Sequence, residues 1–277
     1  MKALKKFIRN LEYSLKSILL KDYLAVDYAV KRNNFGDILN KYLIESITNK
    51  KILRVSSFYY DKKHLLAIGS ILNRATSKSI IWGAGFIEEN SKTLGTPYEV
   101  LAVRGPKTRQ RLIELGISCP EVYGDPALLI PEYYNPKIET QYKLGIIPHY
   151  VDKDHISLAS LEDISILVID ICNPNPLKVI DQLLSCKNIA SSSLHGLIVS
   201  DAYGIPNVRV KFSEKITGGD FKFEDYYLSI NQEITEPIRI ENNLDINAVI
   251  SNAKKTLIKI DLDKLKVAII NYYNIAN

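Results

Sequence analysis

Residues 191–196 carry the side chains whose types and order point most directly to chemistry. Three serines follow a short apolar run, and a histidine then enters a predicted helix. The free amides and the dipole at the start of a helix favour an anion, and a histidine there can act as a general acid or base. The alternative is a serine-rich helix cap with a histidine that makes only structural hydrogen bonds. The candidates in this run are Ser192, Ser193, Leu194, His195 and Gly196.

Arg104 is a second candidate for binding an anion, because it follows an apolar stretch and precedes a Gly-Pro turn. Its planar guanidinium suits a carboxylate or a phosphate; a surface salt bridge is the alternative. Gly83 and Gly85 follow another apolar run and either let the backbone approach a ligand closely or simply make a turn. The chain has neither a complete G-x-G-x-x-G fingerprint nor a Walker sequence, so the pattern does not indicate a dinucleotide site or a P-loop.

A polar turn before the helix predicted over residues 37–47 supplies a third group. Asn34 and Gly36 lie in this turn, and Asp37 is placed either to cap the helix or to act as a base. Asp125, which stands between Gly124 and a proline, has the same two interpretations.

The four histidines lie singly along the chain. His149 follows the first predicted strand of the second half, where it would face a cleft between the halves; an exposed loop residue is the alternative. His64 and His155 are expected at the surface. Because the sequence has no paired histidines or clustered carboxylates at ligand spacing, we expect no metal site.

The elements that must position these residues alternate between short apolar, β-rich runs and helical stretches, the pattern of parallel sheets covered by helices. Ligands of such sheets bind beyond the carboxyl ends of the strands, which is where the candidates lie. Strands are predicted over residues 24–28, 51–55, 65–68, 79–82, 100–103, 143–147, 165–171, 188–190 and 207–210. Helices are predicted over residues 37–47, 106–115, 176–185, 194–202 and 243–258.

A change of composition at residues 131–136, where two prolines bracket polar and aromatic residues, predicts a linker. We therefore expect an α/β protein with two successive α/β units, each large enough to form a domain. The first would comprise residues 1–134, and the second would comprise residues 135–277 and include a C-terminal helix.

The overall composition is that of a globular protein in a reducing compartment. Hydrophobic residues make up 46% of the 277 residues and charged ones 24%, which excludes a disordered chain. Three scattered cysteines argue against a disulfide framework and against a cysteine zinc site. Most of the net charge of +5 lies in residues 1–23, where six basic residues stand against two acidic ones. The near-neutral remainder argues against nucleic acid as a partner.

Residues 1–20 form a predicted amphipathic helix with a basic polar side. Charged residues interrupt its apolar ones, and no apolar run of 18 residues occurs in the chain, so neither a signal peptide nor a membrane span is predicted. One interpretation is a helix packed on the body of the protein. The other is an interfacial contact with an anionic membrane surface.

Seven segments together resemble the polysaccharide pyruvyl transferase family, in the order in which that family shows them. Each segment is short, but seven in the same order are hard to obtain by chance. The last one resembles a segment of bacterial exopolysaccharide and capsule members. The segments are residues 34–37 (NFGD), 82–85 (WGAG), 103–108 (VRGPKT), 124–127 (GDPA), 147–150 (IPHY), 192–198 (SSLHGLI) and 218–227 (GGDFKFEDYY).

The resemblance implies an architecture similar to the GT-B glycosyltransferases, with the active site in the cleft between two Rossmann-like domains. It implies transfer of the enolpyruvyl group of phosphoenolpyruvate to a sugar of a surface polysaccharide or its lipid-linked precursor, with closure of a ketal and release of phosphate. Arg104 and His195 match family residues that contact or act on phosphoenolpyruvate. Many members have an arginine where this chain has Ser193, so we expect another cation to replace it. The lysines considered are Lys211, Lys215 and Lys222.

For this chemistry we expect His195 to be the principal acid and base, with His149 as its partner or as a phosphate ligand. Asp37 and Asn34 would meet the hydroxyls of the acceptor. Phosphoenolpyruvate is a substrate, and no cofactor is expected. We expect a cytoplasmic protein, held at the inner face of the plasma membrane if residues 1–20 bind there.

Two other functions fit the residues. A GT-B glycosyltransferase with a nucleotide-sugar donor would share the two domains and the basic site, but it would release a nucleotide instead of inorganic phosphate. A non-catalytic sugar-phosphate-binding protein of a polysaccharide locus would explain Ser193 at the arginine position. Such a protein would not need both His149 and His195 at strand ends that face the cleft.

Overall fold

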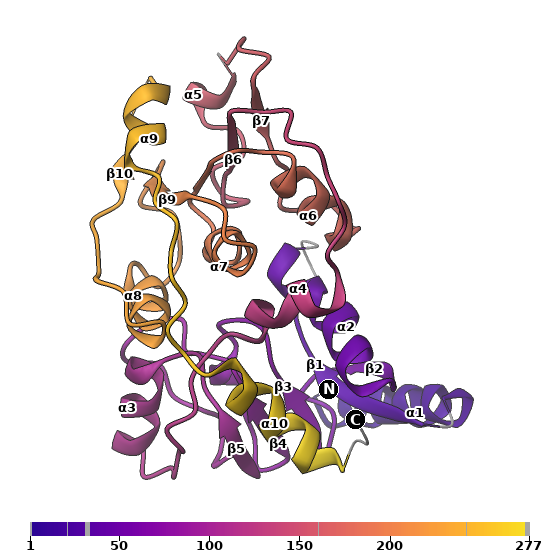
Figure 1. Cartoon of the computed structure of the whole chain (residues 1–277). Helices are drawn as coiled ribbons and strands as arrows, with labels where there is room; N and C mark the ends of the chain where they lie inside the picture. The colour runs from indigo at the N-terminus through magenta and orange to yellow at the C-terminus, as the bar shows by residue number, and fades with distance from the viewer. Residues whose placement is uncertain (1, 21, 31–33, 160, 242, 275–277) are drawn as a thin grey trace.

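The structure is a computed structural model that describes residues 2–20, 22–30, 34–159, 161–241 and 243–274. Its strands form two sheets, one from each half of the chain, and each sheet has five strands (Figure 1). Neighbouring strands are parallel in both sheets. The predicted α/β class is therefore confirmed, and the two sheets are consistent with two Rossmann-like domains.

The first sheet has the strand order β2-β1-β3-β4-β5. Strands β3 and β4 are buried along their whole length, as expected for the middle of a parallel sheet. Pro106 opens α3 and Gly116, at φ +75°, follows its end, as predicted. The elements of this half are β1 (Tyr23–Asp27), α2 (Phe35–Thr48), β2 (Lys51–Val55), β3 (His64–Leu66), η1 (Leu72–Arg74), β4 (Ser79–Trp82), β5 (Glu99–Ala102), α3 (Pro106–Glu114), η2 (Pro126–Leu129) and α4 (Ile130–Tyr133).

The second sheet has the strand order β10-β9-β8-β6-β7. Its central strands β6 and β8 are again buried along their whole length. Elements α4, α5, α8, β10 and α10 come in addition to those predicted from the sequence. The elements of this half are β6 (Leu144–Ile147), α5 (Ile156–Ala159), β7 (Ile166–Val168), α6 (Pro176–Leu184), β8 (Ile189–Ser191), α7 (Leu194–Ala202), β9 (Asn207–Lys211), α8 (Phe221–Ser229), β10 (Ile238–Arg239), α9 (Ile246–Asn252) and α10 (Leu262–Tyr273).

Three predictions about single elements are wrong. Asn34, and not Asp37, is the N-cap of α2, because its side chain accepts a hydrogen bond from the Gly36 amide two residues later. His64 is buried instead of exposed, because it lies in central strand β3 and its Nε2 is 2.8 Å from Ser79 Oγ. The helix predicted over residues 243–258 ends at Asn252, in α9.

The segment predicted as a linker packs against both halves. Residues 130–133 form α4, and the hydroxyl of Tyr134 donates a hydrogen bond to Asp181 in α6 at 2.7 Å. The hydroxyl of Tyr203 donates to the carbonyl of Tyr134. The chain therefore crosses between the sheets in a position that side chains of the second half hold in place.

Helix α10 returns to the first sheet, although its residues follow the second sheet in the chain (Figure 1). The indole of Trp82 at the end of β4 donates a hydrogen bond to the carbonyl of Leu265 at 2.7 Å. One buried apolar cluster contains Leu43, Leu197 and Leu265, so the core continues from the first sheet through α7 to α10. This continuity means that the two halves share a core instead of meeting through a thin interface.

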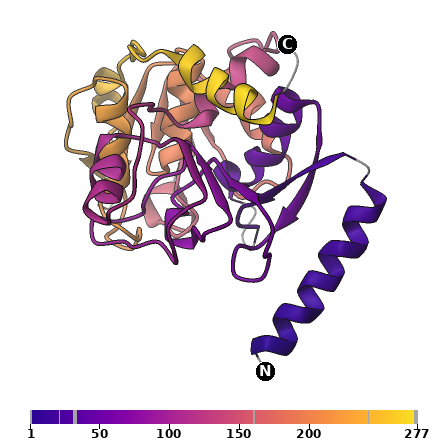
Figure 2. The same ribbon diagram turned by 90° about the horizontal axis from the view of Figure 1, so that it is seen from below.

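Helix α1 (Lys2–Leu19) stands away from the rest of the protein along most of its length (Figure 2). Tyr13 is buried in contact with Tyr60, with the rings edge to face at 5.4 Å. The large apolar residues at helical spacing along its other side are exposed, namely Ile8, Leu11, Leu15 and Ile18. Among the described residues, no helix is long and apolar enough to cross a membrane.

Candidate functional site

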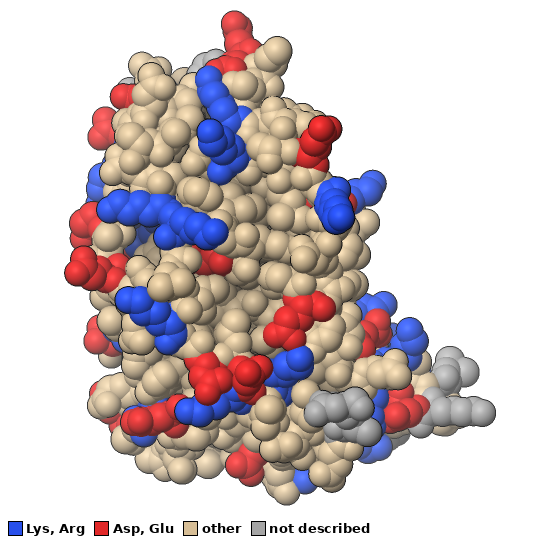
Figure 3. All heavy atoms as spheres, viewed as in Figure 1, with Lys and Arg blue, Asp and Glu red and all other residues tan. Residues whose placement is uncertain are grey.

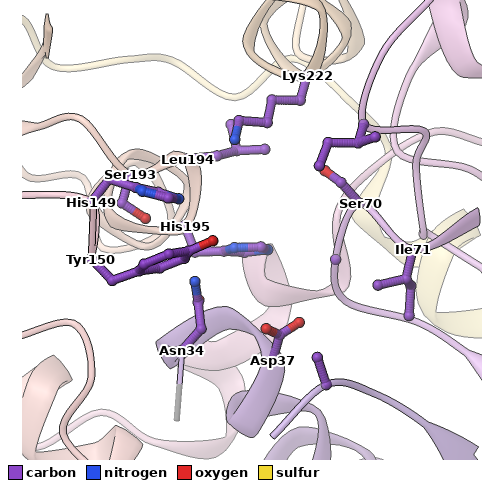
Figure 4. A pocket seen from close by; sticks show the side chains of 13 residues that line it. Asn34, Asp37, Ser70, Ile71, His149, Tyr150, Ser193, Leu194, His195 and Lys222 are labelled. Atoms are coloured by element: carbon purple, nitrogen blue, oxygen red, sulfur yellow. The ribbon is translucent and has the colours of Figure 1, made fainter. Parts of the chain in front are cut away.

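A cavity of about 250 Å³ is lined by residues from both halves of the chain (Figure 4). It lies where strands of both sheets end, since Gly69 follows β3, His149 follows β6 and Ser193 follows β8. Its volume is near the lower limit of about 300 Å³ for sites of drug-sized ligands, which suits a small metabolite. We call Asn34, Asp37 and Ser70 the first-half wall, and His149, Ser193, His195 and Lys222 the second-half wall.

Helix α2 supplies two side chains of the first-half wall. Asn34 caps the helix, and Asp37 lies in its first turn, where the helix dipole favours a carboxylate. Burial nevertheless raises the pKa of Asp37 to about 6, an effect that the nearby His195 and Arg74 partly offset. Near neutral pH this carboxyl is available in both protonation states, so it can accept a hydrogen bond from a hydroxyl or donate one to it.

The serines that precede α7 have different surroundings. Ser191 Oγ donates to the Ile147 carbonyl at 3.1 Å and accepts from the Ser193 amide at 3.0 Å. Ser192 Oγ accepts from the His149 amide at 2.8 Å and so joins the loops that follow β6 and β8. Ser193 is the N-cap of α7, but its side chain makes no capping hydrogen bond and it lines the cavity. Of the three hydroxyls, that of Ser193 is therefore the one placed to meet a ligand.

The N-terminus of α7 lies at the cavity, because Leu194 and His195 line it directly. The dipole of this helix favours an anion there. His149 is buried on the same wall, and its ring lies against that of Tyr150 with centroids 4.1 Å apart. The second-half wall therefore combines two imidazoles with a helix N-terminus.

The imidazole of His195 lies between residues of the first half. Its Nε2 is 3.4 Å from Asp125 Oδ2, and the two side chains are 11% and 1% exposed. A Cβ added at Gly36 would overlap the imidazole ring, so the close approach of α2 to α7 requires a glycine at this position. Gly36 and Asp125 thus touch His195 without lining the cavity themselves.

Lys222 on α8 points into the cavity from the second half (Figure 4). It is buried, and its Nζ makes a long hydrogen bond of 3.5 Å to the Thr217 carbonyl. Burial, together with the neighbouring Arg104 and Arg209, lowers the pKa of Lys222 to about 8. No carboxylate among the described residues forms an ion pair with it, so an anionic ligand would supply the missing negative charge.

Arg104 lies outside the lining of the cavity and is completely buried. Its guanidinium donates to Asp225 Oδ2 at 3.0 Å, to Ser70 Oγ at 2.7 Å and to the Phe86 carbonyl at 2.7 Å. Asp225 belongs to α8, the helix that carries Lys222, and Ser70 belongs to the first-half wall. The structure therefore places Arg104 behind the site, where it connects the two walls.

The remaining glycines considered from the sequence serve close packing. A Cβ at Gly83, where φ is +83°, would overlap the ring of Pro126. A Cβ at Gly85 would overlap the guanidinium of Arg104, and one at Gly196 would overlap the hydroxyl of Ser191. None of these glycines, nor Ser192, is among the described residues that line the cavity.

Ser70 and Tyr150 line the cavity but were not singled out from the sequence. Gly69 and Ser70 follow β3 just as the other candidates follow their strands. The rule that ligands bind beyond the carboxyl ends of parallel strands, here called the strand-end rule, could therefore have identified them. Tyr150 adjoins His149 in one of the seven segments. Of the three lysines considered as replacements for the family arginine, Lys222 lines the cavity, whereas Lys211 pairs with Glu214 at 2.6 Å and Lys215 is exposed.

No group of three or more histidine, cysteine, aspartate or glutamate side chains within the described ranges could hold a metal ion. The cavity instead presents imidazoles, a lysine, hydroxyls and one carboxylate. This set of side chains suits binding of a small anion beside a polyhydroxylated molecule, with proton transfer between them.

Comparisons with known proteins found a matching family model and several similar proteins. The family model described as polysaccharide pyruvyl transferase matches residues 1–213, a range that contains Asp37, His149 and His195 and ends before Lys222. The succinoglycan biosynthesis protein ExoV of Rhizobium meliloti (strain 1021) is 26% identical over 246 residues, which are 81% of this chain and 70% of ExoV.

Two further proteins are similar but carry no functional description. An uncharacterized protein of Acanthamoeba polyphaga mimivirus is 34% identical over 239 residues, which are 81% of this chain and 82% of that protein. The crystal structure of an uncharacterized protein of Klebsiella pneumoniae subsp. pneumoniae is 14% identical with a TM-score of 0.43, and the match covers 84% of this chain and 98% of that one.

Proposed function

Because this chain belongs to the polysaccharide pyruvyl transferase family, we propose that it transfers the enolpyruvyl group of phosphoenolpyruvate to a sugar and closes a pyruvate ketal. The acceptor is a sugar of a surface polysaccharide or of its lipid-linked precursor, in keeping with the printed role of ExoV in succinoglycan biosynthesis. The observation that carries the proposal is the cavity, where an imidazole pair and a lysine on one wall face a carboxyl and a hydroxyl on the other.

The second-half wall suits the donor. Phosphoenolpyruvate carries a phosphate and a carboxylate, so its site needs cations and amide donors. Lys222, the N-terminus of α7 and His149 supply these on one side of the cavity. Lys222 then takes the part of the arginine that many members of the family have at the position of Ser193.

The first-half wall suits the acceptor, because Asn34, Asp37 and Ser70 offer amide, carboxyl and hydroxyl groups to sugar hydroxyls. In this arrangement residues 1–134 form an acceptor domain and residues 135–277 a donor domain, similar to the two domains of GT-B glycosyltransferases. Helix α10 is the exception, since it packs on the first sheet.

The reaction requires two additions at C2 of the donor. In the first, a sugar hydroxyl oxygen bonds to C2 and loses its proton, while C3 gains a proton and becomes a methyl group. In the second, another hydroxyl oxygen bonds to C2, the bond between C2 and the phosphate oxygen breaks, and the proton of that hydroxyl leaves with the phosphate. His195 takes and returns these protons, with His149 as a ligand of the phosphate or as a second acid. This scheme uses no metal ion and no cofactor.

Calorimetry tests the donor. Phosphoenolpyruvate, UDP and inorganic phosphate are titrated separately into the wild type, into Lys222→Gln and into the control Lys215→Gln, whose lysine is exposed. We expect saturable binding of phosphoenolpyruvate that is weakened in Lys222→Gln and unchanged in the control. Preferential binding of UDP would make the protein a glycosyltransferase, and binding of none of the three would contradict the proposed donor site.

The acceptor is lipid-linked if α1 brings the protein to the inner face of the membrane. Tyr13, which packs on the body, lies four residues after Arg9 and three before Lys16, on the polar side of the helix. The apolar side, with Leu11 at 53% exposure and Leu15 at 58%, faces away from the body. On the face drawn in Figure 3 basic and acidic side chains are interspersed, whereas residues 1–23 concentrate basic charge. An anionic bilayer matches an exposed apolar face joined to this charge.

Sedimentation with vesicles tests this contact. We expect the wild type to bind phosphatidylglycerol vesicles at low salt and phosphatidylcholine vesicles far less. The double variant Leu11→Ser/Leu15→Ser should not bind. The control is Leu94→Ser, since Leu94 is an equally exposed leucine far along the chain. Unchanged binding by the double variant would show that these leucines do not contact the bilayer. A wild type that is a dimer and a double variant that is a monomer would show that a second copy of the chain covers this face.

A further inference from the structure

Asp125 and His195 come from different halves of the chain, but their side chains meet behind the cavity. Asp125 is the N-cap of η2, and its Oδ1 accepts a hydrogen bond from the Ala127 amide at 3.0 Å. Its other oxygen, Oδ2, lies 3.4 Å from His195 Nε2. Both of these facing atoms are buried, and neither makes any other hydrogen bond among the described residues. Each is therefore the nearest available partner of the other.

Such a pairing is needed because a buried carboxylate oxygen or imidazole nitrogen without a partner is costly. The separation of 3.4 Å is longer than an ideal hydrogen bond, as is common for catalytic contacts before substrate binds. The cap of η2 already uses one oxygen of Asp125, so the orientation of the carboxyl is set before His195 is considered.

The surrounding backbone holds both groups in place. Pro126, next to Asp125, packs on Gly83, where a Cβ would overlap its ring. Gly36 packs against the face of the imidazole so closely that a Cβ there would overlap the ring. The imidazole is thus confined by Asp125 at Nε2 and by the backbone of α2 against its face.

We propose that Asp125 is a positioning residue that orients His195 and holds the proton of its neutral ring on Nε2, which leaves Nδ1 to exchange protons with the reactants. This inference rests on the proposed pyruvyl transfer and assigns Asp125 a role behind the site, where the sequence indicated a cap or a base. When Nδ1 takes the proton of the sugar hydroxyl, the ring becomes an imidazolium that the Asp125 carboxylate stabilises. When Nδ1 gives that proton to C3, the ring returns to the neutral form.

Asp125→Asn tests the role of the carboxylate, because asparagine keeps the size of the side chain and an oxygen that can cap η2. We expect kcat to fall by about 10²-fold while KM for phosphoenolpyruvate changes by less than about threefold, since Asp125 does not touch the donor. The control Asp245→Asn removes the charge of another capping aspartate, at the start of the distant α9, and should leave both constants unchanged.

Nitrogen-15 NMR of the histidines gives a readout that does not depend on activity. In the wild type we expect the neutral ring of His195 to carry its proton on Nε2. In Asp125→Asn we expect the proton to exchange between Nε2 and Nδ1. The signal of His195 is assigned by its loss in His195→Gln. The proposal is overturned if the proton sits on Nδ1 in the wild type or if the tautomer is the same in both proteins. If the wild type transfers no pyruvyl group, the proposed function fails, but the tautomer still decides whether Asp125 orients His195.

A double-mutant cycle separates positioning from direct contact. In a His195→Gln background, Asp125→Asn should lower the remaining rate by less than about threefold, because its effect acts through the imidazole. An additional loss as large as in the wild-type background would show that Asp125 acts on the substrate itself. Gly36→Ala, which leaves Asp125 intact and displaces the ring from the other side, should reduce kcat even if Asp125→Asn does not fold.

Discussion

The two walls of the cavity differ in charge and in the way the protein holds it. On the second-half wall, Lys222 lies close to the N-terminus of α7, so positive charge gathers there. On the first-half wall, Asp37 is the ionisable group, beside the amide of Asn34 and the hydroxyl of Ser70. Within one small cavity, the second-half wall therefore suits an anion and the first-half wall suits hydroxyl groups.

Burial acts on the charged group of each wall in opposite directions. It raises the pKa of Asp37 to about 6 and lowers the pKa of Lys222 to about 8, so in each case it disfavours the charged form. A bound phosphate or carboxylate would raise the pKa of Lys222 again, whereas a neutral sugar has no such effect on Asp37. The second-half wall therefore suits an anionic ligand, and the first-half wall suits a neutral one.

Removal of the imidazole of His195 should give the largest effect, because it takes the proposed acid and base from the second-half wall. We expect kcat of His195→Ala to fall by about 10² to 10⁴-fold, with phosphoenolpyruvate binding retained within a few fold. Phosphate release and calorimetry measure the two quantities. The control is His155→Ala, because the ring of His155 packs on Phe212 and lies outside the cavity lining. Full turnover by His195→Ala would remove the proposed role.

Arg104→Met tests whether Arg104, which connects the two walls from behind the cavity, stabilises the fold instead of binding the donor. The variant leaves the carboxylate of Asp225 buried without its guanidinium partner, so we expect a loss of about 3 to 5 kcal/mol in the free energy of unfolding. Urea denaturation measures this loss. The control Arg239→Met breaks an exposed pair with Glu214 and should cost at most about 1 kcal/mol. A stable Arg104→Met that cannot bind phosphoenolpyruvate would instead place Arg104 in contact with the donor.

The pH dependence of donor affinity tests the charge of the second-half wall. Lys222 is charged below its pKa of about 8, so affinity for phosphoenolpyruvate should be highest near pH 7 and fall as the pH rises through 8. Lys222→Gln should bind about 10 to 100-fold more weakly at pH 7 and lose this alkaline decline. Calorimetry at pH 7 and pH 9 measures both effects. An unchanged decline in the variant would assign it to another group.

The smallest expected effect concerns the loss of stability that accompanies ionisation of the buried Asp37 on the first-half wall. The pKa of Asp37 is raised on folding, so its contribution is favourable below about pH 4 and is lost as the pH rises through 6. Asp37→Asn should therefore raise the melting temperature by roughly 2 to 4 °C at pH 8 and leave it unchanged at pH 4. Scanning calorimetry at the two pH values measures this, with the exposed Asp154→Asn as control. An equal change at both pH values would show that the ionisation of Asp37 does not limit stability.

Most of the fold could be predicted from local patterns in the sequence. The apolar runs that became β1, β4 and β6 are continuous and lie between polar turns, so their identity depends little on the rest of the chain. Helix α10 was missed, although Leu262, Leu265 and Ile269 recur at helical spacing. The burial of His64 could not be read locally, because its partner Ser79 lies on the neighbouring strand.

The candidate site could be predicted only in part, because its contacts also join residues that are far apart in the sequence. The strand-end rule pointed to Asn34, His149 and His195, all of which line the cavity. It also pointed to Arg104, and nothing local distinguishes an arginine that faces a ligand from one that a distant aspartate such as Asp225 has already bound.

The α/β class, most of the strands and helices and the family follow from the order of apolar runs and short motifs along the chain. Which of the polar residues meet, in contrast, depends on the tertiary structure. It brought Lys222 into the cavity, placed Arg104 behind it and set Asp125 against His195 across the two halves. The physical reason is that charge and hydrogen-bonding partners act over a few ångströms in space, whereas these residues are separated by tens of positions in sequence.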